Sequence, residues 1–214
     1  MNRKVLFTMM VAMTVSAMAC GDDGDDAAKP EPCAIVQTSE DHLLVYLQNA
    51  YRERRIDCYM ELLAADFRFY PDPDTRWRLG VEYWTRSQDS LATARLFSST
   101  EVKRVAVDLA WPPHSAVNAG LLAPYDGWTK LFLTDVFLDV DIEPAGQETN
   151  TYRVENQTQR FFFRQGRTNP PSGAADTLFY IVEWRDDGPR EGKGNRPNAV
   201  LPSTWSSIKA GLVE

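Results

Sequence analysis

The chain has 214 residues, of which 43% are hydrophobic and 11% aromatic. This is enough for one well-packed domain and too little for two. The formal net charge is −7 and no block of lysine and arginine occurs, so the sequence predicts no nucleic-acid partner. Its two histidines, His42 and His114, have no ligand partner at useful spacing, and phosphate-loop, dinucleotide and nucleophile-elbow motifs do not occur. We therefore predict no metal and no cofactor.

Residues 1–19 have the layout of an export signal. Arg3 and Lys4 precede a largely apolar run from Val5 to Val15, which is too short to span a bilayer as a helix. Small residues follow, directly before Cys20. Removal of this segment would take away two cations and no acid, which changes the net charge from −7 to −9.

The surroundings of Cys20 resemble the lipobox of a bacterial lipoprotein, followed by an acidic tether that cannot bury apolar surface. We predict lipidation at Cys20, a disordered tether over residues 20–33 and one domain over residues 34–214. The lipid would anchor the protein to a membrane of the cell envelope, at the periplasmic face or the outer membrane. The alternative is ordinary cleavage after Ala17-Met18-Ala19, itself an A-x-A site.

The other two cysteines are Cys33 and Cys58. If Cys20 carries lipid, they form an even remainder, which in an oxidising compartment suggests a disulfide. The other interpretation is that Cys58 is a small buried residue on its helix.

Residues 38–72 predict two helices and a strand. Thr38 with Asp41 is a helix start signal, with Ser39 as an alternative N-cap. Two apolar stripes at helical spacing follow, separated by the charged residues 52–55. The stripes consist of Leu43, Leu44, Leu47, Ala50 and Tyr51, and then of Ile56, Tyr59, Met60 and Leu63. Phe67 and Phe69 then alternate with polar residues, and the following prolines end this strand.

The rest of the chain predicts one more helix and then strands. Residues 71–84 read as an irregular link, and Thr85 with Gln88 forms a capping box for a helix that ends near Ser99. Strands are expected over residues 105–110, 128–142, 152–164 and 177–185, and an exposed loop over 186–203. The apolar phase slips along 152–164, which predicts a bulge and a bent sheet. Helices followed by antiparallel strands indicate the α+β class.

One hydrophobic core is predicted between the helices and the last two long strands. The strands would contribute Phe161, Phe163, Phe179, Ile181 and Trp184, and the helices Leu43, Leu47, Ile56 and Leu63. The six tryptophans, Trp77, Trp84, Trp111, Trp128, Trp184 and Trp205, are expected to pack in the core or at its rim.

The string AYRERRIDCYMELLAADFRFY, residues 50–70, resembles the opening of NTF2-like proteins, the SnoaL-like and ketosteroid-isomerase-like group. Residues 84–97 resemble the third helix of this group, and residues 179–186 and 204–209 resemble the last strand and the C-terminal end of its lipoprotein-type members. The resemblance covers roughly residues 38–212. It implies a cone in which N-terminal helices pack on a strongly bent antiparallel sheet and enclose a pocket. It also implies a homodimer through the sheet face.

The catalytic pattern of the isomerase-like members is not matched. Their helix tyrosine falls on Leu47, between Tyr46 and Tyr51, and their general-base aspartate falls on Pro71, next to Asp72. Asp72 therefore stays a catalytic candidate, with turn formation as the alternative role.

Further candidates lie in otherwise apolar strands. Asp135 and Glu183 are candidate catalytic acids, because a buried charge is costly unless it serves a purpose. Tyr46, Tyr70 and Arg160 are candidates for a ligand pocket. The alternative is that the strand residues face solvent on the outer side of the sheet.

The sequence as a whole predicts an exported, lipid-anchored domain that acts as a non-catalytic module, for binding a small apolar ligand or for assembly at the envelope. The alternative is a small-molecule isomerase, lyase or hydrolase that uses pocket carboxylates, and a third option is a structural envelope protein. A pocket filled by its own aromatic side chains favours the module. Two converging polar side chains, one with a perturbed pKa, favour the enzyme.

Overall fold

The computed structural model describes residues 33, 37–110, 128–166, 178–189 and 200–211, all of which belong to one compact unit, Cys33–Glu214. These residues form five helices and seven strands. None of the described helices is long and apolar enough to cross a membrane.

The first two helices, α1 (Glu40–Glu53) and α2 (Ile56–Leu62), follow the two predicted stripes. Ser39 caps α1, because its hydroxyl accepts a hydrogen bond from the His42 N–H at 3.3 Å. Arg54 ends α1 in the left-handed conformation, with φ of 54°. Leu63, the last member of the second stripe, is already the first residue of strand β1 (Leu63–Tyr70).

The expected irregular link over residues 71–84 contains a helix, α3 (Pro73–Leu79), so that prediction is wrong. Asp72 caps α3, and Pro73 occupies the first turn, where a missing N–H costs no hydrogen bond. Trp77 of α3 is 87% exposed, which also contradicts the prediction that every tryptophan packs in the core or at its rim.

The other described tryptophan side chains, Trp84, Trp184 and Trp205, are buried as predicted. The side chains of Trp111 and Trp128 lie outside the described part of the chain.

The predicted third helix is α4 (Arg86–Ser98). Its capping box is confirmed, because Thr85 Oγ1 accepts from the Gln88 N–H and the Gln88 side chain accepts from the Thr85 N–H. Trp84–Thr85, the short strand β2, precedes it and pairs with β1. The short C-terminal helix α5 (Trp205–Gly211) is the last described element.

One sheet contains all the described strands, in the order β2-β1-β6-β5-β4-β3, with β7 paired to β5. Its remaining strands are β3 (Val102–Ala110), β4 (Trp128–Ile142), β5 (Asn150–Gln165), β6 (Phe179–Pro189) and β7 (Val200–Pro202). Neighbouring strands are antiparallel except for the pairs β1–β6 and β5–β7, which are parallel. The predicted loop over residues 186–203 therefore includes the end of β6 and all of β7.

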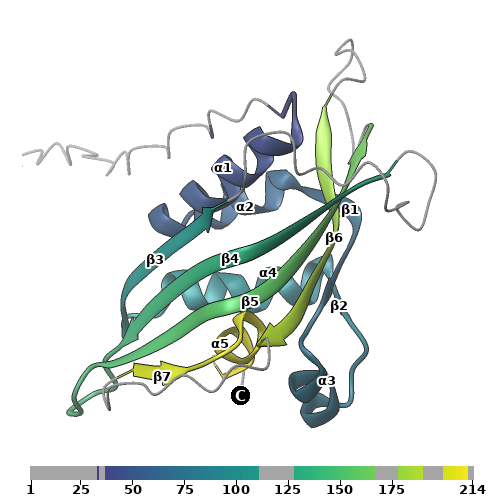
Figure 1. Cartoon of the computed structure of the whole chain (residues 1–214). Helices are drawn as coiled ribbons and strands as arrows, with labels where there is room; N and C mark the ends of the chain where they lie inside the picture. The colour runs from purple at the N-terminus through teal and green to yellow at the C-terminus, as the bar shows by residue number, and fades with distance from the viewer. Residues whose placement is uncertain (1–32, 34–36, 111–127, 167–177, 190–199, 212–214) are drawn as a thin grey trace, which may run out of the picture. The chain divides into compact units, whose positions relative to one another are not determined.

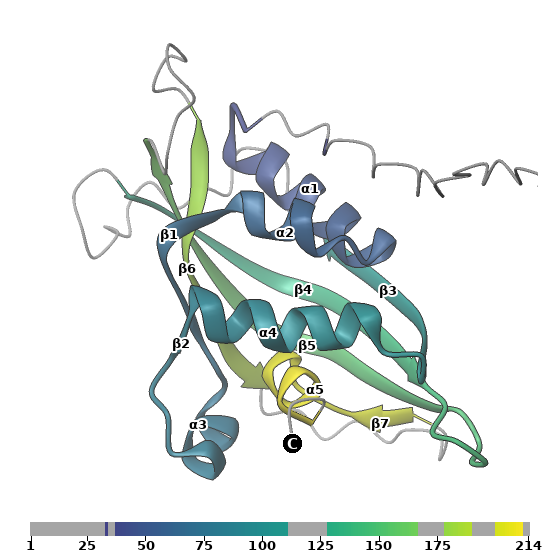
Figure 2. The ribbon, with the colours of Figure 1, turned by 180° about the vertical axis from the view of Figure 1, so that it is seen from behind.

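The bulges predicted from the phase slip of β5 are present. The register shifts between Gln157 and Gln159 and between Phe162 and Phe163 on the side of β6, and twice more on the side of β4. Figures 1 and 2 show that the sheet is curved and that α1, α2, α4 and α5 lie on one of its faces. The predicted α+β class, with N-terminal helices packed on a strongly bent and mainly antiparallel sheet, is confirmed.

The predicted core lies between this sheet face and the helices. Phe161, Phe163, Ile181 and Trp184 are completely buried, and Phe179 is half-buried against them. From the helical side, Leu43, Leu47 and Leu63 are buried and Ile56 is half-buried. The stripes thus cover the densest apolar part of the sheet.

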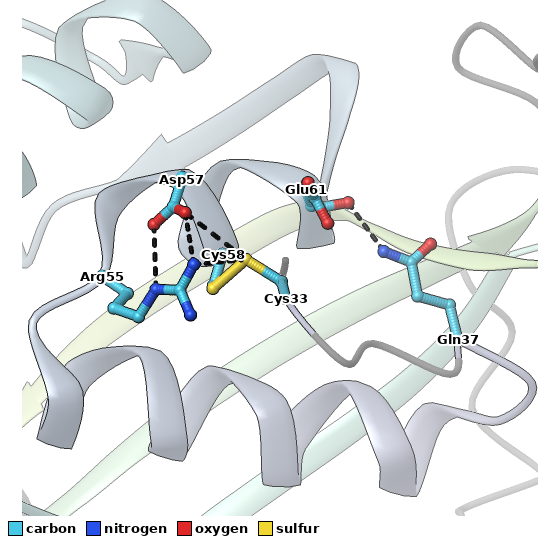
Figure 3. Close-up of a disulfide and its surroundings, with 6 residues drawn as sticks. All are labelled: Cys33, Gln37, Arg55, Asp57, Cys58 and Glu61. Carbon is cyan, nitrogen blue, oxygen red and sulfur yellow. Dashed lines mark hydrogen bonds and ion pairs between the residues drawn. A yellow bond between two sulfur atoms is a disulfide. The ribbon is translucent and has the colours of Figure 1, made fainter. Parts of the chain in front are cut away.

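A disulfide joins Cys33 to Cys58 and ties the segment before α1 to α2 (Figure 3). Next to it, Arg55 forms an ion pair of 2.6 Å with Asp57. Among the described residues, one group of potential metal ligands lies close together, and it consists of Cys33, Asp57 and Cys58. Since the two sulfurs are bonded to each other, neither can act as a thiolate ligand.

Candidate functional site

Large aromatic side chains fill the space between the helices and the sheet. Tyr51, Tyr59, Trp184 and Trp205 are completely buried there. The ring centroids of Tyr51 and Trp205 lie 5.1 Å apart and those of Trp184 and Trp205 lie 4.9 Å apart, all in edge-to-face contact. The interior that could enclose a ligand is thus occupied by the side chains of the chain itself.

A buried ion pair lies among these rings. Lys209 Nζ of α5 is 2.7 Å from Asp89 Oδ1 of α4, and the Tyr59 hydroxyl donates to the other oxygen of Asp89 at 2.5 Å. Burial, the largest single influence, would lower the pKa of Lys209, but the charge and hydrogen bonds of Asp89 and Tyr51 together outweigh it and raise this pKa. Burial and the same carboxylate raise the pKa of Tyr59 well above its usual value. Sequence reasoning missed this pair, because 120 residues separate its partners.

An open groove lies between α3, β5 and α5, outside the aromatic interior. Its volume is about 750 Å³, within the range of small-molecule sites. Trp77 and Arg78 contribute from α3, Tyr152 and Gln157 from β5, and Ile208 from α5. The exposed indole of Trp77 gives this groove an apolar wall.

Asp72 lies at the floor of the groove, at the junction of β1 and α3. Its Oδ1 accepts hydrogen bonds from the backbone N–H groups of Asp74 and Thr75, at 3.0 and 3.2 Å. Its Oδ2 accepts from the hydroxyls of Thr204 and Ser206, at 2.7 and 2.8 Å. Burial alone would raise the pKa of Asp72, but these hydrogen bonds outweigh burial and hold its pKa below the usual value.

Ser206 connects Asp72 to a second buried carboxyl group, Asp186 at the end of β6. The Ser206 Oγ lies 2.6 Å from Asp186 Oδ2 and accepts a hydrogen bond from the Asp72 N–H at 2.9 Å. Because a serine has one hydroxyl proton and Oγ touches two carboxylate oxygens, the two contacts need a second proton. Burial raises the pKa of Asp186, although its hydrogen bonds with Ser206 and Gln159 act in the opposite direction. We therefore assign the second proton to Asp186.

Gln157 lines the groove with a side chain that is only partly hydrogen-bonded. The side chain is 3% exposed, and its Nε2 donates to the Ser203 carbonyl at 2.5 Å. This bond fixes the orientation of the amide, because a carbonyl oxygen can only accept. The Oε1 atom is buried and has no hydrogen-bond partner among the described residues. A ligand that donates an N–H or O–H would satisfy it.

The candidates for a ligand pocket, Tyr46, Tyr70 and Arg160, do not line the groove. Tyr46, on α1, packs against the main core on the helical side of the sheet. Tyr70 contacts Arg185, whose guanidinium also lies over the ring of Phe162 in a separate small cluster. Arg160 forms an ion pair with Asp187 on β6. The bulges invert the alternation of side chains along β5 and β6, so strand parity alone could not place these residues.

The three candidate catalytic acids belong to different parts of the sheet and its connections. Glu183 is 4% exposed and forms an ion pair with Arg185, outside the groove. Asp135 lies in β4 opposite Ala110, and its side chain lies outside the described part of the structure. Asp72 alone among the three lines the groove.

The fold and the groove together define the class of this protein as an α+β domain with helices on one face of a curved sheet and a binding groove beside its last helix. No protein-family model and no curated protein sequence matches the chain.

Solved NTF2-like and SnoaL-like proteins are among its structural neighbours. A protein from Novosphingobium aromaticivorans, named for aromatic ring hydroxylases, is 11% identical, with 69% of this chain and 84% of that chain covered and a TM-score of 0.43. An NTF2-like protein from Rhodospirillum rubrum is 14% identical, with 69% and 95% covered and a TM-score of 0.39. A protein from Shewanella denitrificans, named for SnoaL-like polyketide cyclases, is 9% identical, with 68% and 87% covered and a TM-score of 0.37. The activities in these names belong to those proteins.

Proposed function

We propose that the chain is an exported, lipid-anchored NTF2-like domain that acts as a non-catalytic binding module at the cell envelope. Its binding surface is the groove between α3, β5 and α5, and its ligand is a small, largely apolar molecule with a hydrogen-bond donor. One observation carries this proposal. The same groove holds an indole that is 87% exposed and a buried amide oxygen that has no partner among the described residues.

The state of Asp72 supports a binding role over catalysis. Each of its two carboxylate oxygens accepts two hydrogen bonds, and the pKa of Asp72 lies below the usual value. A general base is most effective when its pKa is close to the working pH. Asp72 is therefore a poor proton acceptor, and its hydrogen bonds instead join α3 to α5. The alternative, an isomerase, lyase or hydrolase, would need a different acid in the groove.

A fluorescent apolar anion, 8-anilinonaphthalene-1-sulfonate, is a suitable probe of the groove because it combines aromatic rings with an N–H donor. We expect the wild type to bind it and Trp77→Ala to bind it about tenfold more weakly, a loss of about 1.4 kcal/mol. Leu91→Ala is the matched control, since Leu91 is 60% exposed on α4 and does not line the groove. Equal binding by the wild type and Trp77→Ala would show that the groove is not the binding surface.

Export and anchoring have separate support. A disulfide such as Cys33–Cys58 persists in oxidising compartments, and the layout of residues 1–26 resembles a lipoprotein leader. Detergent partition and intact-mass analysis of the wild type against Cys20→Ser test the anchor. We expect the wild type in the detergent phase and Cys20→Ser in the aqueous phase. The same partition and processing for both proteins would contradict lipidation. A homodimer through the sheet face remains a prediction for sedimentation analysis.

A further inference from the structure

The ammonium group of Lys209 lies among four aromatic rings in the interior of the domain. Its Nζ is 4.7 Å from the ring centroid of Phe69 and 5.0 Å from that of Trp184. The rings of Tyr59 and Tyr51 are centred 5.3 and 5.8 Å away. All four distances lie within the range of about 6 Å over which a ring face attracts a cation.

One anion completes these surroundings. Asp89 Oδ1 lies 2.7 Å from Nζ, and the hydroxyl of Tyr59 lies 3.4 Å from it. The side chains of Lys209 and Asp89 are both 0% exposed. We call the group that surrounds the cation the ammonium cage, which consists of Tyr51, Tyr59, Phe69, Asp89 and Trp184.

The cage and its occupant come from different parts of the fold. The cage residues belong to α1, α2, β1, α4 and β6, whereas the cation belongs to α5. The helix α5 is not part of the described sheet and has no strand-pairing hydrogen bonds with it. Side-chain hydrogen bonds attach this helix. Ser206 Oγ bonds to Asp72 and Asp186, and Trp205 Nε1 donates to the Tyr51 hydroxyl at 2.9 Å. No cage residue belongs to α5, although Trp205 of this helix packs against Tyr51 and Trp184.

We propose that the ammonium cage is a binding site for a primary alkylammonium group, and that Lys209 is the ligand that the chain itself supplies. The ring faces and the single carboxylate favour a cation over a neutral group. The hydrogen bond to Asp89 favours a primary ammonium, which keeps its N–H groups, over a quaternary one. A soluble amine of this kind competes with Lys209 and releases α5. This site is separate from the groove and does not depend on its function.

The full chain with Lys209→Ala tests the selectivity of the cage. The substitution removes Cγ, Cδ, Cε and Nζ, and n-propylammonium supplies the same chain of three carbons and one nitrogen. We expect saturating n-propylammonium to raise the Tm of Lys209→Ala by at least about 2–4 °C. The neutral analogue n-propanol should raise it by less than half as much at the same concentration. If Lys209→Ala is unfolded in buffer, refolding in n-propylammonium replaces the Tm shift as the supporting result.

Two control variants separate a cation site from a simple cavity. Lys209→Met refills the cage with an uncharged chain, and Lys209→Ala with Asp89→Asn lacks the anion. We expect n-propylammonium neither to stabilise nor to refold either of them. The selectivity of the cage is overturned if n-propylammonium has no effect on Lys209→Ala, if n-propanol acts equally, or if the Asp89→Asn double variant responds as strongly.

Hydrogen exchange of the wild type tests whether an outside amine can displace Lys209. We expect n-butylammonium, which reproduces the whole lysine side chain, to increase the exchange rate of the amides of α5 at least about threefold at constant ionic strength. The amides of β4 and β5 should keep their rates, and tetramethylammonium chloride should have no such effect. Unchanged exchange in α5 would overturn the competition, and an equal increase with tetramethylammonium would overturn the preference for a primary amine.

Discussion

Lys209 Nζ on α5 lies 2.7 Å from Asp89 Oδ1 on α4, and neither side chain is exposed to solvent. Removing two ions from water costs several kcal/mol for each ion, which their mutual attraction offsets only when the geometry is good. The pair therefore contributes to stability only as a unit, and loss of one partner leaves a buried charge without compensation.

The ion pair leads to a first prediction. Lys209→Met should lower the free energy of unfolding by about 3–5 kcal/mol in urea denaturation at pH 7, because it leaves Asp89 buried and unpaired. Adding Asp89→Asn should restore most of this loss, since the asparagine still accepts from Tyr59 but carries no charge. If Lys209→Met is as stable as the wild type, or if the double variant is less stable than the single one, the pair does not act as described.

The second prediction concerns pH and Asp72. Because hydrogen bonds lower its folded-state pKa, Asp72 contributes stability that is complete above its unfolded pKa of about 3.9 and is lost as the pH falls through the folded value. We expect Asp72→Asn to stay folded and to lose about 1–3 kcal/mol at pH 7. The difference in Tm between Asp72→Asn and the wild type should shrink as the pH falls below about 4. A difference that stays constant or grows in acid would contradict this.

Asp186 should show the opposite dependence on pH. Burial raises its folded-state pKa, so its contribution to stability is complete below about pH 3.9 and is lost as the pH rises through the folded value. The difference in Tm between the wild type and Asp186→Asn should therefore be largest in acid and should shrink toward neutral pH. Parallel slopes for Asp72→Asn and Asp186→Asn would show that the proton is not held at Asp186.

The disulfide gives a fourth prediction. Cys33 and Cys58 are separated by 25 residues, and closing a loop of this size stabilises a folded chain by about 3 kcal/mol. We expect Cys33→Ser to lose about this amount in urea denaturation under oxidising conditions. The reduced wild type, measured in dithiothreitol, should match the variant. Equal stability of Cys33→Ser and the oxidised wild type would mean that the bond does not constrain the unfolded chain.

The core gives a fifth prediction. Phe163 on β5 is completely buried, so Phe163→Ala should cost about 3–5 kcal/mol, a large part of a typical stability of about 5–15 kcal/mol. Gln165→Ala is the control on the same strand, because Gln165 is exposed and should change stability by no more than about 0.5 kcal/mol. Thermal unfolding distinguishes the two. A wild-type Tm for Phe163→Ala would show that the strand's inward phase is misassigned.

The sequence by itself determined the features of this protein that depend on nearby residues. The stripes of α1 and α2, the capping box of α4 and the strand pattern around Phe67 and Phe69 all follow from spacings of a few residues. The phase slip of β5 likewise indicated its bulges. The helix α3 was misread, because a proline after Asp72 is compatible both with a turn and with the first turn of a helix. The end of β6 and the short strand β7 were also missed, within the expected loop over residues 186–203.

The tertiary structure alone decided which polar groups meet. Asp72 and Ser206 are 134 residues apart in sequence and Asp89 and Lys209 are 120 apart, yet each pair is in hydrogen-bond contact. The bulges decided the outcome for Tyr70, Arg160 and Glu183, because one extra residue moves the following side chains to the other face of a sheet. Local spacing contains no information about such long-range register, so the groove and the ammonium cage became visible only in the folded chain.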